Sequence, residues 1–535
     1  MAINKNNKLR SLATMMTAAM LSSSCSLVGP DYVKPESAVE TKWINQSSPE
    51  ISKRTVELST WWKVFNDPVL DRLITEARLQ NLGLQVAGTR ILEARAQLGI
   101  VTSTEYPQLQ QANGDLSQQQ ISAFAPNTSS IIDRSFASTG IGFDMGWELD
   151  IWGKFRRGVE SSLANLDASV AGYDDVLVSL TAEVARTYVL VRTSEVRIQV
   201  ARDNVKIQER TVKIADALFT GGLINELDYL QAESLLDNTR ASIPPLEAEL
   251  RQAKNALSVL LGRPPGTIDS YLTESKSIPV APLQVAIGVP AELLRRRPDI
   301  RLAERQLATQ SALIGVAKAD LYPHFSLLGS ISLRASDAAL TYASMGGSTL
   351  GQLFNAKSFQ YFIGPSISWD IFNYGRITNQ VRVEDARFQS LVGVYRDTVL
   401  KAAKEAEDAT AGFLNAQKQR DELQLSYGAA KRSTDLSLYQ YSEGLVDYQR
   451  VLDSQRTLVT SQSALASTTG NIAINLIALY KAVGGGWETR TEKDFVPEAV
   501  KKDMRERTNW GDLMEPKQLD LPEQDKSKKW RLPDW

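Results

Sequence analysis

The segment WELDIWGK at residues 147–154 returns as WDIFNYGR at residues 369–376. The separation, 369 minus 147, is 222 residues, and it continues downstream without a gap. It carries the pair Gly222-Leu223 onto Gly444-Leu445, Leu230 onto Leu452, and Gly262 onto Gly484. A repeat of this length governs the architecture, because each copy is one structural unit that packs on its neighbour. We therefore predict two copies of one unit.

Upstream of these segments the offset is different. Gly99 and Pro107 match Gly315 and Pro323 at 216 residues, which is 315 minus 99. The six-residue difference falls between the proline and the first tryptophan of each copy. Because homologous units tolerate length changes mainly in loops, we expect the difference in the loops.

Each copy contains a long segment without proline, at residues 154–218 and 376–440. Both are rich in Ala, Leu, Val, Glu, Arg and Gln, which favour helix. At 1.5 Å per residue, about 65 residues make a rod of roughly 100 Å. Apolar residues recur at three- or four-residue spacing, as packing between helices requires: Leu177, Leu180, Val184, Tyr188 and Val191. Each copy is expected to run helix, two strands, very long helix, turn, helix.

Strands are predicted where apolar and polar residues alternate. Residues 141–149, 363–371 and 325–334 have this two-residue period, whereas the glutamine-rich residues 109–119 give a weak signal. Lengths near ten residues suit tilted transmembrane strands. An aromatic cluster suits a belt at the membrane interface: Trp147, Trp152, Trp369 and Tyr374. The alternative is the edge of a soluble β-sandwich.

Four transmembrane strands in one chain determine the expected assembly. A sheet in lipid has no open edge, because each unpaired backbone group there costs several kcal/mol. Four strands cannot close on themselves, whereas three subunits supply twelve. The predicted fold is mainly α with a transmembrane β part: a trimeric twelve-stranded β-barrel, continued by a long periplasmic α-helical barrel.

The composition excludes several classes of function. Lys and Arg number 60 against 62 Asp and Glu, a balance that argues against a nucleic-acid partner. His324 and Cys25 are the sole histidine and cysteine, so a structural zinc site and an intrachain disulfide are excluded. No glycine-rich phosphate loop is present. We expect neither enzymatic activity nor a cofactor.

The N-terminus has the pattern of a secretory signal: Lys5, Lys8 and Arg10, a short apolar stretch over residues 12–21, and three serines before Cys25. The apolar stretch is shorter than the roughly 20 residues that span a bilayer as a helix. The run before Cys25 resembles a bacterial lipobox, although Leu21 lies four residues before the cysteine instead of three. We expect lipid attachment at Cys25. The alternative is an incidental thiol in a discarded peptide.

Four longer motifs occur in order: CSLVGPDYVKP from Cys25, WWKVFNDPVLDRLI from Trp61, LLRRRPDIRLAE at residues 293–304 and YSEGLVDYQRVLDSQ from Tyr441. With them the chain resembles the outer membrane factors of tripartite efflux pumps, of the TolC and OprM type, in the NodT-like lipoprotein branch. The resemblance runs from about residue 25 to residue 486. It implies a homotrimeric exit duct in the outer-membrane lipid, docked on a periplasmic adaptor that links it to an RND-type inner-membrane transporter. The expected cargo is drugs or other small toxic molecules.

The resemblance also implies site residues. An inward-facing aspartate ring that closes the periplasmic tip falls on Asp453, and a narrowing position falls on Gln449. Arg450 and Arg456 lie within one helical turn and are expected to hold the closed state through ion pairs. Adaptor contacts fall on the paired turns Gly222-Leu223 and Gly444-Leu445. The alternatives are a solvated helix-face charge for Asp453 and a purely structural turn for the two glycines.

The expected division of the chain is a lipoprotein signal peptide at 1–24, a lipidated segment at 25–68, repeat 1 at 69–262, a linker at 263–289, repeat 2 at 290–484 and a tail at 485–535. The RRRPD run at residues 295–299 is interpreted as a helix start, with proline in the first turn. The tail either wraps the middle of the helical part or stays disordered. Two other functions stay open: a type I protein secretion duct of the same architecture, and a periplasmic coiled-coil structural protein.

Overall fold

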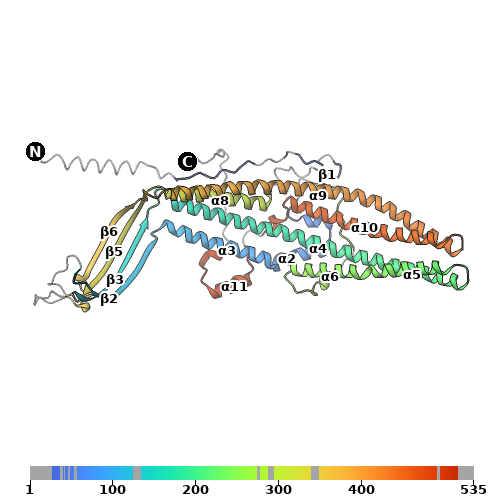
Figure 1. Cartoon of the computed structure of the whole chain (residues 1–535), viewed down its shortest axis with the longest axis horizontal. Helices are drawn as coiled ribbons and strands as arrows, with labels where there is room; N and C mark the ends of the chain where they lie inside the picture. The colour runs from blue at the N-terminus through green and yellow to red at the C-terminus, as the bar shows by residue number, and fades with distance from the viewer. Residues whose placement is uncertain are drawn as a thin grey trace, which may run out of the picture.

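The chain is an elongated molecule with a β-sheet at one end and two helical hairpin tips at the other (Figure 1). The computed structural model describes residues 27–36, 40, 42–45, 48–52, 57–124, 134–273, 277–286, 295–338, 349–490 and 494–515. Its main helices are α2 (Pro68–Gln80), α3 (Leu82–Thr102), α4 (Lys154–Thr220), α5 (Glu226–Ala241), α6 (Ile243–Leu260), α8 (Pro298–Ala319), α9 (Arg376–Ser442), α10 (Tyr448–Ala482) and α11 (Glu498–Arg507). The strands are β1 (Ile51–Ser52), β2 (Leu109–Gln120), β3 (Ser135–Glu148), β4 (Val285–Ala286), β5 (His324–Ser336) and β6 (Phe359–Ser368).

The long helices α4 and α9 confirm the duplication. Each has 67 residues, and both their first and last residues differ by 222. Gly153 and Gly375 precede them with φ angles of 79° and 81°, a left-handed conformation that glycine adopts without steric cost. The predicted apolar stripe of α4 is buried, with Leu177, Val184 and Tyr188 at most 1% exposed.

The helix after the first turn differs from the prediction. A single helix was expected in each copy, but repeat 1 has two, α5 and α6, which meet at Ser242. Pro244 and Pro245 lie in the first turn of α6 and lack the backbone N–H that a continuous helix needs. Repeat 2 has Ala466 and Ser467 at the equivalent positions, and α10 runs unbroken for 35 residues.

The four long strands form one antiparallel sheet in the order β2-β3-β5-β6. The order joins the two copies through the central pair β3 and β5, which is paired from Ser138↔Ser336 to Glu148↔Ser326. Within one chain, β2 and β6 are the edges, and each has a strand on one side only. The strands predicted at 141–149 and 325–334 are confirmed as β3 and β5. The strand predicted at 363–371 is confirmed in part, because β6 ends at Ser368 and residues 369–371 lie beyond it.

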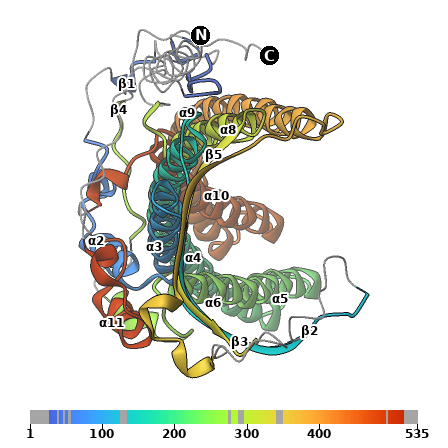
Figure 2. The same ribbon diagram turned by 90° about the vertical axis from the view of Figure 1, so that its left-hand side faces the viewer.

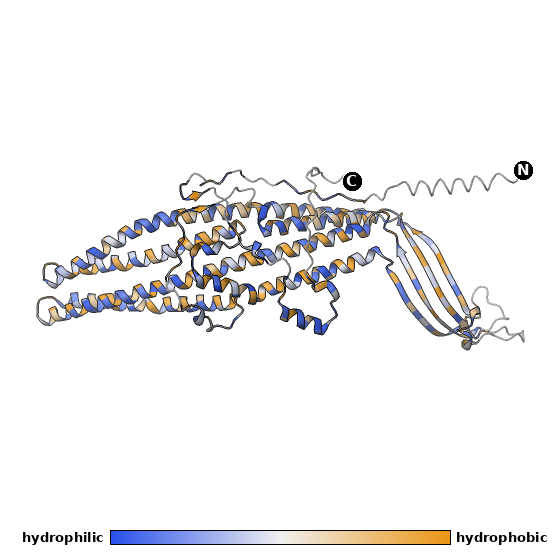
Figure 3. Ribbon diagram, turned by 180° about the vertical axis from the view of Figure 1, so that it is seen from behind, coloured by the Kyte–Doolittle hydropathy of each residue, from blue (hydrophilic) through white to orange (hydrophobic). Residues whose placement is uncertain are grey.

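The sheet has two chemically different faces, and Figure 3 shows hydrophobic and hydrophilic residues alternating along its strands. The apolar face carries Phe143, Ile331 and Ile363, which are 69%, 58% and 68% exposed although they are large and hydrophobic. The polar face carries Asp144, Ser330 and Gln360 among others. A contiguous exposed apolar surface of this extent marks a site of contact with a membrane or with another protein.

The register shows where the 216-residue offset between the two copies ends. Leu109 pairs with Gly146, which pairs with Leu328, so odd positions of β2 share the polar face with even positions of β5. The 216-residue offset preserves parity and therefore stops at the prolines: β2 begins two residues after Pro107 and β5 one residue after Pro323. The six-residue difference is thus not confined to the loops, because part of it lies where the strands begin.

The main core lies midway along the helices. Trp61 is 1% exposed and stacks on Tyr480, with 5.2 Å between the ring centroids. Seen from the strand end, the helices and the sheet follow one arc (Figure 2). The helices α2 and α11 and the two-stranded ribbon of β1 and β4 lie on the convex side, and α10 lies inside the arc, between α8/α9 and α5/α6 (Figure 2). Each chain therefore resembles a segment of a tube wall.

The described part of the C-terminal tail wraps this middle region, as one of the two alternatives expected. Phe495 and Val496 are buried in the main core, and Met514 is 2% exposed. Arg95 of α3 donates hydrogen bonds to the carbonyl oxygens of Leu513 and Glu515, at 3.2 and 3.3 Å. The segment lies close enough to α3 that a Cβ on Gly88 would be 2.0 Å from the Phe495 carbonyl oxygen.

We predict that Gly88→Ala releases this segment from α3. The added methyl group overlaps a backbone oxygen, which costs on the order of 1–3 kcal/mol in a packed site. Thermal denaturation should start at lower temperature, and tryptic cleavage within α11 should accelerate.

The matched control is Gly99→Ala in the same helix, where a Cβ meets nothing within 4 Å. Alanine favours helix over glycine by up to about 1 kcal/mol, so this variant should be as stable as the wild type or slightly more stable. Equal protease resistance of both variants would contradict the close packing of Phe495 on α3.

Candidate functional site

The junction between strands and helices is built twice by the same hydrogen bond. The Trp147 indole donates to the Glu105 carbonyl oxygen at 3.3 Å, and the Trp369 indole donates to that of Leu321 at 3.0 Å. The donors differ by 222 residues and the acceptors by 216, so the duplication carries the contact across the change of offset. Each bond ties the end of the second strand of a copy to the turn that precedes its first strand.

The other two predicted interface aromatics lie at the same junction. Trp152 stacks on Tyr322 with 4.7 Å between ring centroids and donates to the Pro323 carbonyl oxygen at 2.8 Å. Tyr374 is fully exposed and has a φ angle of 49°, which is unusual for tyrosine. The structure thus brings Trp147, Trp152, Trp369 and Tyr374 to one level of the molecule. Their role at a membrane surface stays a prediction.

The N-terminal segment is held at this level by a buried arginine. Arg157 is 2% exposed; it pairs with Asp31 at 2.9 Å and donates to the carbonyl oxygens of Val28 and Gly29. The Val28 N–H donates to the Trp152 carbonyl oxygen at 3.1 Å. Cys25, the predicted lipidation site, lies outside the described residues. The first described residues after it are therefore anchored beside the strands.

The two tips at the opposite end have the same geometry. Gly222 and Gly444 have φ angles of 71° and 69°, and the Leu223 and Leu445 N–H groups reach back to the carbonyl oxygens five residues earlier. This is the glycine-dependent stop that ends a helix. The side chains of Leu223 and Leu445 are 75% and 71% exposed. The predicted pairs therefore lie together at the end of the molecule opposite the sheet, and their leucine side chains are exposed (Figure 1).

A small core between the tips was not predicted. Tyr441 and Tyr448 pack edge to face at 5.6 Å, are at most 2% exposed, and their hydroxyl groups have no hydrogen-bond partner among the described residues. Burial and the nearby carboxylate of Asp228 raise the pKa of Tyr441 to about 12. Burial and the carboxylate of Asp447 raise the pKa of Asp228. The tips of repeat 1 and repeat 2 therefore meet at side chains, Tyr441 and Asp228, whose surroundings favour the neutral form.

The predicted aperture residues lie on α10 just after its tip. Asp453 accepts a hydrogen bond from the Gln449 side chain at 3.0 Å, and both are exposed within one chain. Asp447 caps the helix by accepting from the Arg450 N–H at 3.3 Å. In the described part of the chain neither Arg450 nor Arg456 forms an ion pair with Asp453, so the predicted ion pairs stay a prediction about assembled copies.

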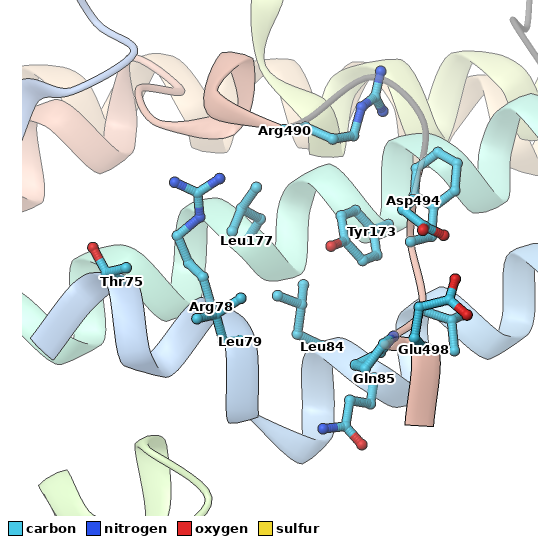
Figure 4. Close-up of a pocket in the computed structure, with 13 residues that line it drawn as sticks. Thr75, Arg78, Leu79, Leu84, Gln85, Tyr173, Leu177, Arg490, Asp494 and Glu498 are labelled. Atoms are coloured by element: carbon cyan, nitrogen blue, oxygen red, sulfur yellow. The ribbon is translucent and has the colours of Figure 1, made fainter. Parts of the chain in front are cut away.

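A pocket of about 350 Å³ lies at the middle of the molecule, under the C-terminal segment (Figure 4). Leu84, Leu177 and Tyr173 contribute to its lining, and Arg78 donates to the Thr489 carbonyl oxygen at 2.6 Å. The charged groups around it are already paired: Lys501 neutralises Asp494 and Glu498, and Arg490 pairs with buried Asp174 at 2.8 Å. The Arg78 and Arg490 contacts fasten the C-terminal segment to α2 and α4, whereas the Lys501 pairs lie within that segment.

The RRRPD run is structural, as predicted. Pro298 is the first residue of α8, and Arg297 pairs with Asp299 at 2.7 Å and with Glu405 at 2.8 Å. Among the described residues no three side chains of His, Cys, Asp or Glu come together as a metal site. Within the same residues, no helix combines the length and hydrophobicity needed to cross a bilayer.

An amphipathic four-stranded sheet on a curved wall of very long helices defines a class of protein, the outer-membrane channels whose strands continue into a helical duct. The chain belongs to the outer membrane efflux protein family, whose sequence model matches residues 73–263 and again 289–485. The two matches correspond to the two repeats.

Similar proteins agree with this family. The probable outer membrane lipoprotein SilC of Salmonella typhimurium is 28% identical over 90% of this chain and 99% of its own length. The toluene efflux pump outer membrane protein TtgI of Pseudomonas putida is 30% identical over 88% of this chain and 97% of its own. The structure of the outer-membrane channel OprN superposes with a TM-score of 0.78 at 31% identity, over 86% of this chain and 99% of that one.

The chain is therefore an outer-membrane lipoprotein, the non-enzymatic channel of an efflux system, with a large periplasmic helical part. The predicted fold class, family and location are confirmed. The alternatives of an enzyme and of a coiled-coil structural protein are excluded by the family and by the sheet.

We predict that Asp228→Asn removes a pH dependence of tip packing. A carboxyl group whose pKa is raised by folding stabilises the fold fully below its ordinary pKa, and the contribution is lost as pH rises through the raised value. Hydrogen-exchange protection of the Tyr441 and Tyr448 amides, corrected for intrinsic rates, should fall in the wild type as the pH rises above about 4, the ordinary pKa of an aspartate. In the Asp228→Asn variant, this protection should not change with pH over the same range.

Asp216→Asn, at an exposed position of α4, is the control and should keep the wild-type slope. If Asp228→Asn and the wild type have the same slope, Asp228 is not the group that couples the two tips to pH.

Proposed function

We propose that three copies of the chain close a twelve-stranded barrel and conduct small molecules from the periplasm to the outside. The observation that carries this proposal is the sheet: its apolar face is exposed, and its edge strands β2 and β6 have one neighbour each. In hydrocarbon an open edge leaves backbone groups without hydrogen bonds, so β6 of one copy pairs with β2 of the next. In a closed homotrimer every strand has a hydrogen-bonded neighbour on both sides.

The helices support the same closure. In Figure 2 the short elements that cover the wall, α2, α11, β1 and β4, all lie on the convex side of the arc. Three such arcs enclose a lumen that continues from the barrel through the helical part. Exposed apolar residues on the two flanks of the arc, such as Val86 of α3 and Leu400 of α9, are then covered by neighbouring copies.

The tips are the proposed docking site for a periplasmic adaptor, which connects the duct to an RND-type inner-membrane transporter. Leu223 and Leu445 are exposed apolar side chains held on rigid turns, a combination that suits insertion into a partner's groove. Because both turns have the same backbone geometry, each copy offers two equivalent contacts. Gly222 and Gly444 contribute by holding the turns.

The proposed aperture is the ring of Asp453 contributed by three copies, with Gln449 one turn closer to the tip. Carboxylates that converge on one axis repel each other and attract cations, so their packing depends on salt. Arg450 and Arg456 lie on the same helix and are proposed to pair with groups of neighbouring copies in the closed state.

Lipid attachment is proposed at Cys25, two residues before the segment that Arg157 holds beside the strands. Trp147, Trp152, Trp369 and Tyr374 are proposed to lie at the membrane surface at the same level, because amphipathic aromatic rings prefer that zone. The cargo is proposed to be small organic toxicants, by analogy with the toluene efflux relative.

The closure is tested by crosslinking Leu116→Cys on β2 and Tyr361→Cys on β6, both on the apolar face and 75% and 71% exposed. Within one chain three strand spacings, about 14 Å, separate them, beyond a bismaleimide of about 10 Å span. Pairing between copies should give linear dimers and trimers on a denaturing gel and nothing larger.

The matched control is Phe143→Cys with Ile331→Cys, which are directly paired within one chain and should yield monomers only. Cys25 is the only native cysteine, so the added pairs are unambiguous. A continuous ladder beyond the trimer, or monomers alone, would contradict a closed barrel of three.

Docking is tested by Leu445→Asp, alone and with Leu223→Asp. A charge in an apolar contact should cut the adaptor recovered with the chain by tenfold or more, a loss of about 1.4 kcal/mol or greater. Drug tolerance of a deletion strain should then be restored poorly. Phe354→Asp, 79% exposed at the far end of the strands, should restore it fully. Normal adaptor recovery by the double variant would refute the tip assignment.

A further inference from the structure

The polar face of the strands carries a net negative charge, and we infer that it makes the barrel lumen selective for cations. This inference rests on the proposed closure of three copies into one barrel, because the lumen exists only there. It goes further by locating charge selectivity in the strands, about one hundred ångströms of helix away from the tip aspartates.

The register places all charged strand residues on one face. Asp144 pairs with Gln111 and Ser330, Glu148 with Ser326, and Arg334 with Gly140. Each of these pairs lies on the polar face. The opposite face of the same strands carries Phe143, Ile331 and Ile363 and is exposed to lipid. Every strand charge therefore faces the lumen.

The charges do not cancel. The four strands contain three carboxylates, those of Asp115, Asp144 and Glu148, against one guanidinium, that of Arg334. Arg334 pairs with Asp115 at 3.3 Å. Three minus one leaves two negative charges per chain when the single histidine is neutral, and six for three copies.

Among the described residues, neither of the two remaining carboxylates pairs with a lysine or an arginine. Asp144 accepts a hydrogen bond from the Asn113 amide at 2.5 Å, and the amide brings no charge. Glu148 lies 2.7 Å from Nδ1 of His324, at the level where the strands meet the helices. Repeat 2 has no carboxylate equivalent to Asp144, because the 222-residue offset carries Asp144 onto the uncharged Ser366.

Fixed charges in a narrow aqueous tube with an apolar outer wall focus their field along the axis. Cations are concentrated in such a lumen and anions are excluded, most strongly at low ionic strength, where the Debye length exceeds about 10 Å. The strands therefore favour cationic and neutral solutes over organic anions, which narrows the class of exported molecule.

The test measures the K⁺ to Cl⁻ permeability ratio from reversal potentials of single channels in a planar bilayer under a KCl gradient. All variants are made in an Asp453→Ala background, which removes the tip carboxylates and should raise conductance by opening the tip. The background channel should still prefer K⁺. Asp144→Asn with Glu148→Gln should lower the ratio by at least about threefold, and more at 0.1 M than at 1 M salt.

Both substitutions keep shape and hydrogen-bonding capacity, so loss of folding is not expected. Asp144→Lys with Glu148→Gln leaves one net positive charge per chain on the strands, so it should go further and favour Cl⁻. The control is Asp397→Asn, a charge on α9 remote from the strands, which should leave the ratio unchanged. Conducting channels with the same ratio in the background and the double variant would overturn this inference while leaving the duct intact. Absence of conductance in the background itself would overturn the closed barrel and the inference with it.

Discussion

The backbone of an amphipathic sheet has to find hydrogen-bond partners where no water reaches it, and the rest of this molecule follows from that constraint. Four strands with an apolar face satisfy their internal pairs but leave the outer edges of β2 and β6 open. The sheet is therefore a part that requires other copies. The curvature of the wall and the position of α2, α11 and the β1–β4 ribbon on its convex side are consistent with that requirement (Figure 2).

The two copies of the repeat build the same backbone architecture. They differ in the charged and aromatic side chains that they place on it. The junction is the conserved element within the chain, since Trp147 and Trp369 make the same hydrogen bond in both copies. The polar face is different: Asp144 of repeat 1 corresponds to Ser366 of repeat 2. The tips are alike in backbone but differ inside, where Tyr441 and Tyr448 of repeat 2 pack near Asp228 of repeat 1.

Helix lengths and strand faces were predictable because they depend on local periodicity. A proline-free stretch of favourable residues fixes α4 and α9 almost to the residue, and strict alternation fixes the two faces of β3 and β6. Pro244 and Pro245 were equally readable in the sequence and should have predicted the break between α5 and α6. The strand β2 was harder, because glutamine on both faces gives no contrast between lipid and lumen.

By itself the sequence determined the duplication, the long helices, the alternating strands and the absence of enzymatic machinery, because each is a property of composition or of spacing along the chain. Only the tertiary structure decided which distant segments meet: the C-terminal segment on Gly88 of α3, Arg157 around Val28, and the buried tyrosines of the tips beside Asp228. It also decided that the strand carboxylates share one face. Such contacts join residues hundreds of positions apart, and no local period encodes them.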